Sequence, residues 1–173
     1  MQITAPSKSD YPEFYGTYVR KVAPLDLIPG MEDDLSQLKQ LVASLSPEQI
    51  EHRYAPDKWN MKQLLGHIID AERVFAYRTL WFARNMKEPV DGMDQEHFCQ
   101  FDNSDNRSIA DLLEEFEHVR LSTIALFKSF TEDHLSMTGT ASGGHFTVRA
   151  KGFIILGHST HHRMVYEERY LNT

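Results

Sequence analysis

The chain has 173 residues, of which 41% are hydrophobic and 25% are charged, and its formal net charge is -7 at pH 7. This length and composition predict one globular domain that is large enough to bury a substantial core. Basic residues are scattered among acidic ones, so the sequence lacks the dense cationic surface that nucleic-acid binding requires.

Cysteine content and hydropathy restrict the class of protein further. The single cysteine, Cys99, excludes an intrachain disulfide and a multi-cysteine zinc site. The N-terminal segment lacks the continuous apolar run of a signal peptide, and the longest aliphatic run, near residues 153–156, is too short to span a bilayer. We therefore expect a cytoplasmic protein that acts on a small molecule, without a nucleic-acid or membrane partner.

Residues 1–30 are expected to form an N-terminal arm that packs on the body of the protein. Four of the seven prolines lie in this segment, which argues against a long helix there. Its aromatic side chains indicate packing on the core instead of a free tail: Tyr11, Phe14, Tyr15 and Tyr18. The remaining residues, 31–173, are predicted to form one domain.

Two amphipathic helices are predicted to follow this arm. From about Met31 to Leu45, leucine and valine recur at intervals of three and four residues, as on a helix with one buried stripe. Asn60 and Gln63 resemble a capping box that opens a second helix, which runs to about Asn85. Because the second helix is long and rich in large apolar residues, we expect it in the middle of the structure.

The second half of the chain contains two more predicted helices and two irregular segments. Turn residues between 86 and 107 interrupt any periodicity, which predicts a long connection before a third helix that begins at Ser108. The stretch 131–145 contains glycines typical of one or two tight turns, and a small hairpin is compatible with it. Thr147 is the expected N-cap of a fourth helix that reaches Tyr170. This pattern predicts an all-α four-helix bundle.

Histidines on the apolar faces of the second and fourth helices are the candidate functional residues. His158 and His162 are four residues apart, so both imidazoles lie on one face of a helix. Two ligands hold a metal weakly, and His67, in the apolar stripe of the second helix, is the candidate for a third. Buried neutral imidazoles need partners, and one metal ion would satisfy all three.

Alternatives remain open on the spacing alone. His161, three residues from His158, could also act as a ligand, and paired histidines at this spacing are common on helices without a metal. A lone inward His67 is more often an ordinary core histidine. Zinc held by three histidines would leave one position open for water or substrate, and nickel, iron or manganese also accept such ligands. No glutamate adjoins His158 as in HExxH, so zinc-protease chemistry is not expected.

The tripeptide Leu-Gly-His occurs on both histidine-bearing helices, at residues 65–67 and 156–158. A glycine inside a helix costs about 1 kcal/mol relative to alanine, so its presence needs a reason. Close approach of two helices beside the histidines is one such reason, and a chance match of three residues is another.

Several short motifs between Met31 and Leu171 carry a resemblance to a known family. They are Tyr54-Ala55-Pro56, Lys58-Trp59, Leu65-Gly66-His67, Asp70-Ala71-Glu72-Arg73, Gly139-Thr140-Ala141-Ser142-Gly143, Val148-Arg149-Ala150, Gly157-His158, His161-His162 and Glu168-Arg169-Tyr170-Leu171. In these motifs the chain resembles the DinB-like family of metal-dependent enzymes, and within it the branch of bacillithiol-dependent S-transferases.

This resemblance implies a four-helix bundle with a long crossover connection, often dimeric, and a three-histidine site for zinc or nickel. Carried over to the matching positions, the metal ligands are His67, His158 and His162, which leaves His161 outside the site. The resemblance implies a transferase or hydrolase in which the open metal position activates a low-molecular-weight thiol cosubstrate or water. No general base can be named. Asp70, one turn from His67, is a candidate acceptor that orients an imidazole, and an ordinary surface charge is the alternative.

A second hypothesis is a non-catalytic bundle. The metal would then only stabilise the fold, or an apolar pocket would bind a ligand or a partner chain. Apolar residues left exposed by the bundle, such as Trp81 and Phe82, would form the interface, for example in a homodimer.

Overall fold

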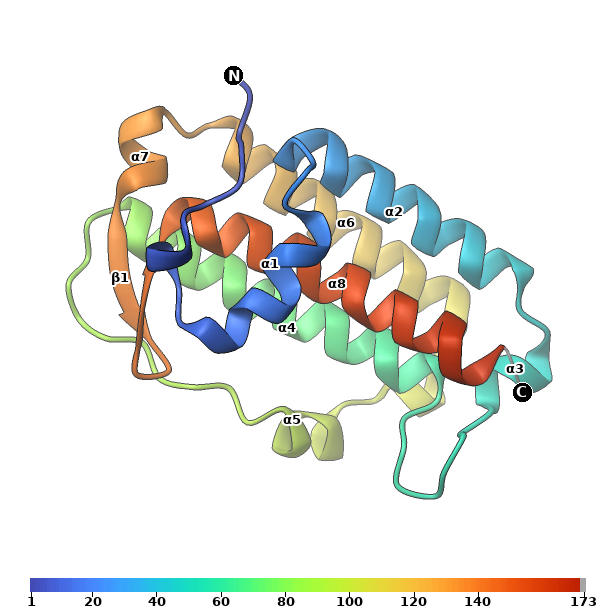
Figure 1. Cartoon of the computed structure of the whole chain (residues 1–173). Helices are drawn as coiled ribbons and strands as arrows, with labels where there is room; N and C mark the ends of the chain where they lie inside the picture. Colours follow the sequence, from blue (N-terminus) through green and yellow to red (C-terminus); the bar gives the residue numbers. More distant parts are fainter. Residues whose placement is uncertain (172–173) are drawn as a thin grey trace.

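Four long helices form the bundle in the computed structural model, which describes residues 1–171. They are α2 (Leu27–Ser44), α4 (Met61–Ala83), α6 (Ile109–Lys128) and α8 (Val148–Tyr170). The helices lie side by side, with α4 and α6 running in one direction and α2 and α8 in the other (Figure 1). The predicted all-α four-helix bundle is confirmed.

The connection between α4 and α6 accounts for this order of helices. Residues 84–108 run along the outside of the bundle from one end to the other (Figure 1) and include α5 (Gln95–Phe101) and η3 (Ser104–Asn106). Because α6 begins at the end of the bundle where α4 begins, a tight hairpin cannot join them and a long crossover is needed. The antiparallel α2 and α4 are joined by the short helix α3 (Pro47–Glu51).

The first bundle helix begins earlier than the sequence pattern indicates. It starts at Leu27, with Asp26 at the N-cap position, whereas the apolar periodicity predicts a start near Met31. Pro29 therefore lies inside the first turn, where the backbone N–H groups have no acceptor within the helix and a proline is tolerated. The starts of α4, α6 and α8 agree with the predicted side-chain caps, Asn60, Ser108 and Thr147.

The N-terminal residues pack on the bundle through short helices: η1 (Lys8–Asp10), η2 (Glu13–Tyr15) and α1 (Gly16–Val22). Ile3, Val19 and Val22 are buried in the same apolar cluster as residues of α8. In Figure 1, α1 lies across α8, and this places Tyr18 next to the histidines of that helix.

A small hairpin lies at one end of the bundle, after α7 (Glu132–Ser136). Strands β1 (Thr138–Ala141) and β2 (Gly144–Thr147) pair antiparallel. Ser142 and Gly143 join them with φ angles of 50° and 74°, as in a two-residue hairpin turn of left-handed conformation. Val90 of the crossover forms a bridge to Ala141, so the hairpin also holds the start of the crossover.

The prediction that Phe82 is exposed at an interface is wrong. Phe82 is fully buried, and its ring fills the space that a side chain at Gly139 would occupy. Trp81 is partly exposed, and its indole N–H donates to the carbonyl of Glu88 at 3.0 Å. Within residues 1–171, no helix combines the length and the apolar character needed to cross a membrane.

A buried charge network joins the four long helices. Arg120 of α6 is fully buried and donates to both carboxylate oxygens of Glu72 on α4, with its Nη2 2.8 Å from Oε2. Its Nη1 donates to Oδ2 of Asp34 on α2 at 3.1 Å. Asp34 also accepts from the hydroxyls of Ser159 and Thr160 on α8, at 2.6 and 3.0 Å.

Burial opposes the charge on Arg120, but the two carboxylates outweigh this effect and raise its pKa. Arg120 therefore stays charged, and each bundle helix contributes a polar group to the network.

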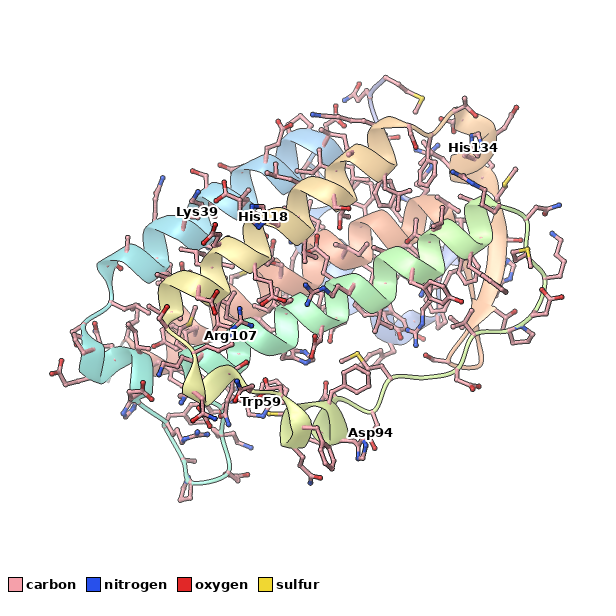
Figure 2. All side chains as sticks on the ribbon, turned by 180° about the vertical axis from the view of Figure 1, so that it is seen from behind. Lys39, Trp59, Asp94, Arg107, His118 and His134 are labelled. Carbon is pink, nitrogen blue, oxygen red and sulfur yellow. The ribbon has the colours of Figure 1, made fainter. Side chains whose placement is uncertain are left out.

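Removing the cation from this network is expected to destabilise the protein strongly. Arg120→Met should lower the free energy of unfolding by about 3–5 kcal/mol, because two buried carboxylates lose their partner. The control is Lys39→Met, which breaks a partly exposed ion pair with Glu117 between α2 and α6. Lys39 lies on the outer surface (Figure 2), so its loss should cost at most about 1 kcal/mol. Urea unfolding followed by circular dichroism measures both, and equal losses would contradict the assigned role of Arg120.

Candidate metal centre

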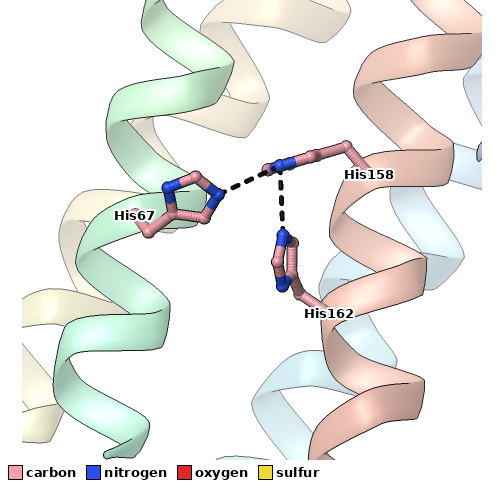
Figure 3. Close-up of side chains that lie close together, drawn as sticks. All are labelled: His67, His158 and His162. Atoms are coloured by element: carbon pink, nitrogen blue, oxygen red, sulfur yellow. Dashed lines mark hydrogen bonds between the residues drawn. The ribbon is translucent and has the colours of Figure 1, made fainter. Parts of the chain in front are cut away.

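Three histidines from two helices point toward one another inside the bundle (Figure 3). His67 comes from α4, and His158 and His162 come from successive turns of α8. The Nε2 atom of His158 lies 3.1 Å from Nε2 of His67 and 3.2 Å from Nε2 of His162. Ligand atoms of all three residues lie within 4.8 Å of one another. The structure thus brings together the three residues that the sequence singles out.

The spacing of these nitrogens suits a shared divalent cation. Imidazole nitrogens bind zinc at about 2.0–2.1 Å, so two ligands of a tetrahedral site lie about 3.3 Å apart. Hydrogen bonds alone account less well for the cluster, because Nε2 of His158 has one lone pair and two ring nitrogens adjoin it. A cation would use the lone pairs of all three rings at once.

Burial keeps these imidazoles neutral. Desolvation lowers the pKa of His67 to about 4. Desolvation and the neighbouring imidazoles lower the pKa of His162 to about 3 and that of His158 well below 6.5. At pH 7 all three rings are therefore in the form that binds metals, and protons compete weakly for their lone pairs.

Aromatic rings surround the histidines. Trp59 lies 4.7 Å from His67 between ring centroids, and Tyr18 and Phe75 lie 5.4 and 5.6 Å from His158. These rings restrict the orientation of the imidazoles and limit access of bulk water.

The glycines that precede two of the histidines have different structural reasons. A Cβ atom at Gly157 would lie 2.4 Å from the carbonyl oxygen of Tyr18, so this glycine permits α1 to approach α8. A Cβ atom at Gly66 would lie 2.1 Å from Oγ of Ser104, so that glycine makes room for the crossover. The expected close approach of two helices beside a histidine is confirmed for Gly157, although the approaching helix is α1 and not α4.

Two other residues considered from the sequence lie outside the cluster. His161 packs against Tyr18, with ring centroids 5.5 Å apart. Asp70 has its carboxylate 4.0 Å from the guanidinium of Arg73, and Nδ1 of His67 is buried with no hydrogen-bond partner among residues 1–171. The role of Asp70 as an orienting acceptor stays a prediction. His118, on the outer face of α6 (Figure 2), is exposed and remote from the site.

Two cavities adjoin the histidines. One has a volume of about 190 Å³ and is lined by His67, His158, Arg78 and aromatic side chains. The other, of about 210 Å³, is lined by His162 and Trp59. Gln95, from the crossover, lines both cavities, so this connection helps to cover the site.

The sequence reasoning missed Arg78 and the covering residue Gln95. Arg78 continues the stripe formed by His67, Ala71 and Phe75 on α4, and this helical spacing was the signal that could have revealed it. Gln95 lies in the crossover, where no periodicity indicates which side chains point inward.

A buried lysine, Lys151, lies among aromatic rings, two of which, Tyr15 and Phe75, also line the 190 Å³ cavity. Lys151 is fully buried, with its Nζ 3.4 Å from the ring centroid of Phe146. The same atom lies 5.6 to 5.9 Å from the rings of Tyr15, Phe75 and Phe82. It has no hydrogen-bond partner in the described part of the chain. Burial, with a contribution from nearby Arg78, lowers the pKa of Lys151 to about 7.

Fold and site together define the class: a four-helix bundle with a crossover and a three-histidine cluster that adjoins two cavities. The sequence model of the DinB superfamily matches residues 31–165. The chain therefore belongs to the DinB superfamily.

Solved structures agree with this assignment. The chain is similar to YfiT from Bacillus subtilis, described as a probable metal-dependent hydrolase with an unusual four-helix bundle topology. The TM-score is 0.74 and the identity 16%, over 96% of this chain and 91% of YfiT. It is also similar to the DinB-like protein YjoA from Bacillus subtilis, with a TM-score of 0.59 and 15% identity over 84% of this chain and 90% of YjoA.

At these identities the likeness establishes the fold. No curated protein matches the chain. The bacillithiol-dependent branch stays a prediction.

The buried lysine gives the protein a specific pH dependence. The unfolded chain holds the Lys151 proton up to about pH 10.5, whereas the folded protein releases it near pH 7. Burial of the lysine therefore costs stability at and below pH 7, and the cost falls as the pH rises toward 10.5. Lys151→Met should raise the free energy of unfolding at pH 7, and this gain should be about 2 kcal/mol smaller at pH 9. Urea unfolding at the two pH values measures it.

The matched control is Lys87→Met, since Lys87 is exposed in the crossover. Its effect on unfolding should be small and the same at both pH values. A pH-independent effect of Lys151→Met would show that the lysine stays charged in the folded protein.

Proposed function

We propose that the protein is a metal-dependent enzyme that binds one divalent cation through His67, His158 and His162. The observation that carries this proposal is the convergence of three neutral imidazoles, of which His67 and His158 line one cavity and His162 lines another. Three protein ligands leave one position free, as in catalytic zinc sites. Zinc and nickel are the proposed metals, because imidazole ligands suit both.

Hydrolysis of a small molecule is the first candidate reaction. When bound, the metal supplies a Lewis acid that lowers the pKa of water in its open position. The chain's own residues shape the substrate site: Tyr18 and Phe75, which pack beside His158, line the cavity and shield it from bulk water. The description of YfiT as a probable metal-dependent hydrolase supports this candidate.

Transfer of a low-molecular-weight thiol is the second candidate, and the second cavity favours it. A reaction of two substrates needs two binding sites that meet at the reacting atoms. His162 lines one cavity while His67 and His158 line the other, so the cluster is accessible from two cavities. In this case the thiol would replace water as the activated nucleophile.

A non-catalytic role of the metal is the alternative proposal. The metal would then hold α4 to α8, and the bundle would serve as a binding module or as a homodimer. Exposed apolar side chains on α4, Tyr77 and Leu80, give a surface for such a dimer. Analytical ultracentrifugation distinguishes a monomer from a dimer.

Metal content tests the ligand set. Protein purified without chelators is expected to hold about one zinc or nickel ion per chain, as the three-histidine site predicts. His67→Ala and His162→Ala should each reduce the bound metal to background. His161→Ala is the matched control, because His161 neighbours the cluster without joining it, and this variant should keep its metal. Elemental analysis after gel filtration gives these values. A wild-type protein that fails to bind added zinc would end the proposal.

Activity screening tests the reaction class. The metal-loaded protein is offered esters and amides with water, and electrophilic acceptors with small thiols. Turnover in one series is expected, and His67→Ala should lower it by about 100-fold or more, since even outer partners of metal sites contribute about 10–100-fold. Loss of stability on metal removal, without turnover in either series, would favour the non-catalytic alternative.

A further inference from the structure

Arg78 is a buried cation in the wall of the 190 Å³ cavity. It lies on α4, on the same helical stripe as His67, and only 2% of its surface is exposed. The ring of Phe75 lies close to both the histidine cluster and Arg78. Its centroid is 5.6 Å from that of His158 and 5.9 Å from Cζ of Arg78. The guanidinium and the histidine cluster therefore belong to one cavity.

The guanidinium of Arg78 lacks an anionic partner within residues 1–171. Nη2 donates to the carbonyl oxygen of Asp91, and Nε is buried with no hydrogen-bond partner. No carboxylate forms an ion pair with Arg78 in this part of the chain, whereas the other deeply buried arginine, Arg120, pairs with Glu72 and Asp34. A buried charge without a counter-ion destabilises the folded state, so this arrangement needs an explanation.

Arg78 cannot escape this cost by losing its proton. An arginine stays charged at neutral pH, unlike a buried lysine such as Lys151. Lys151 also approaches Phe75, and its charge adds to that of Arg78 when it is protonated. An anion bound in this region would therefore balance the positive charge of Arg78.

The rest of the cavity suits an apolar body. Its lining includes the rings of Phe14, Tyr15, Tyr18 and Phe75 and the side chain of Met93, and it contains no aspartate or glutamate. A cavity of about 150 Å³ is known to accept one benzene ring, so about 190 Å³ has room for a ring with a small polar substituent.

We infer that Arg78 binds the anionic group of a small aromatic substrate, a carboxylate or a phosphate, inside this cavity. A planar guanidinium whose Nε–H has no partner among residues 1–171 matches either anion and binds it by charge-assisted hydrogen bonds. The substrate would extend from Arg78 along Phe75 toward His67 and His158. Its placement at those histidines rests on the proposed metal-dependent function, but the anion site itself does not.

Binding of anions to the metal-free protein tests this inference. Phenylacetate, phenyl phosphate and the neutral phenylacetamide are titrated into chelator-treated protein by isothermal calorimetry. At least one of the two anions should bind about 10-fold or more tightly than phenylacetamide, as charge-assisted hydrogen bonds predict. Their relative affinities identify whether the site prefers a carboxylate or a phosphate. Absence of binding by both anions, or equal affinity for phenylacetamide, overturns the inference.

Substitutions assign the binding to Arg78. Arg78→Gln should weaken anion binding about 10-fold or more without changing the affinity for phenylacetamide. Arg84→Gln is the matched control, because it removes the same charge from an exposed residue at the end of α4, outside the cavity. It should bind the anions like the wild type. Anion binding that survives Arg78→Gln overturns the inference.

Arg78 also tethers the crossover through Asp91, so a purely structural role must be separated from anion binding. Arg78→Lys keeps the charge and a donor, and it should bind anions more tightly than Arg78→Gln. A structural tether predicts instead that both variants change the affinities for anion and amide together. Zinc binding should be unchanged in all Arg78 variants, because the three histidines are intact. Anion binding without zinc binding would retain the inference and remove the proposed enzyme function.

Discussion

The ion pairs of Arg120 fix the relative positions of the four long helices. Its guanidinium holds Glu72 of α4 and Asp34 of α2, and Asp34 in turn accepts hydrogen bonds from Ser159 and Thr160 of α8. Buried charged hydrogen bonds tolerate little displacement, because a broken one leaves a desolvated ion without a partner. Ser159 directly follows His158, so the rotation and axial position of α8 are fixed at the histidine cluster itself.

Much of the bundle follows from local chemistry that is readable in the sequence. Caps at Asn60, Ser108 and Thr147 mark three helix starts, and apolar periodicity gives their buried faces. The start of α2 was harder to predict, because Pro29 interrupts the pattern without interrupting the helix. The four-residue strands of the hairpin are too short for an alternating pattern to be recognised.

The candidate site can be predicted only in part from the sequence. Inward-facing His67, His158 and His162 can be selected from spacing, and the resemblance to a family excludes His161. A paired and an unpaired arginine look alike in a sequence: Arg78 and Arg120 both lie within apolar stripes. Their difference depends on which carboxylates the other helices bring near them, and this is a property of the three-dimensional packing.

The two buried arginines divide the bundle into regions of different electrostatic character. Around Arg120 the carboxylates of Glu72 and Asp34 neutralise the charge. Near the ring of Phe75, Arg78 and Lys151 have no carboxylate partner among the described residues, and the three histidines are neutral. A divalent cation held by neutral ligands keeps its full charge, which makes it a stronger Lewis acid than one with carboxylate ligands. With such an ion bound, the cavity would carry positive charge at both ends, and a negatively charged substrate would complete its electrostatic balance.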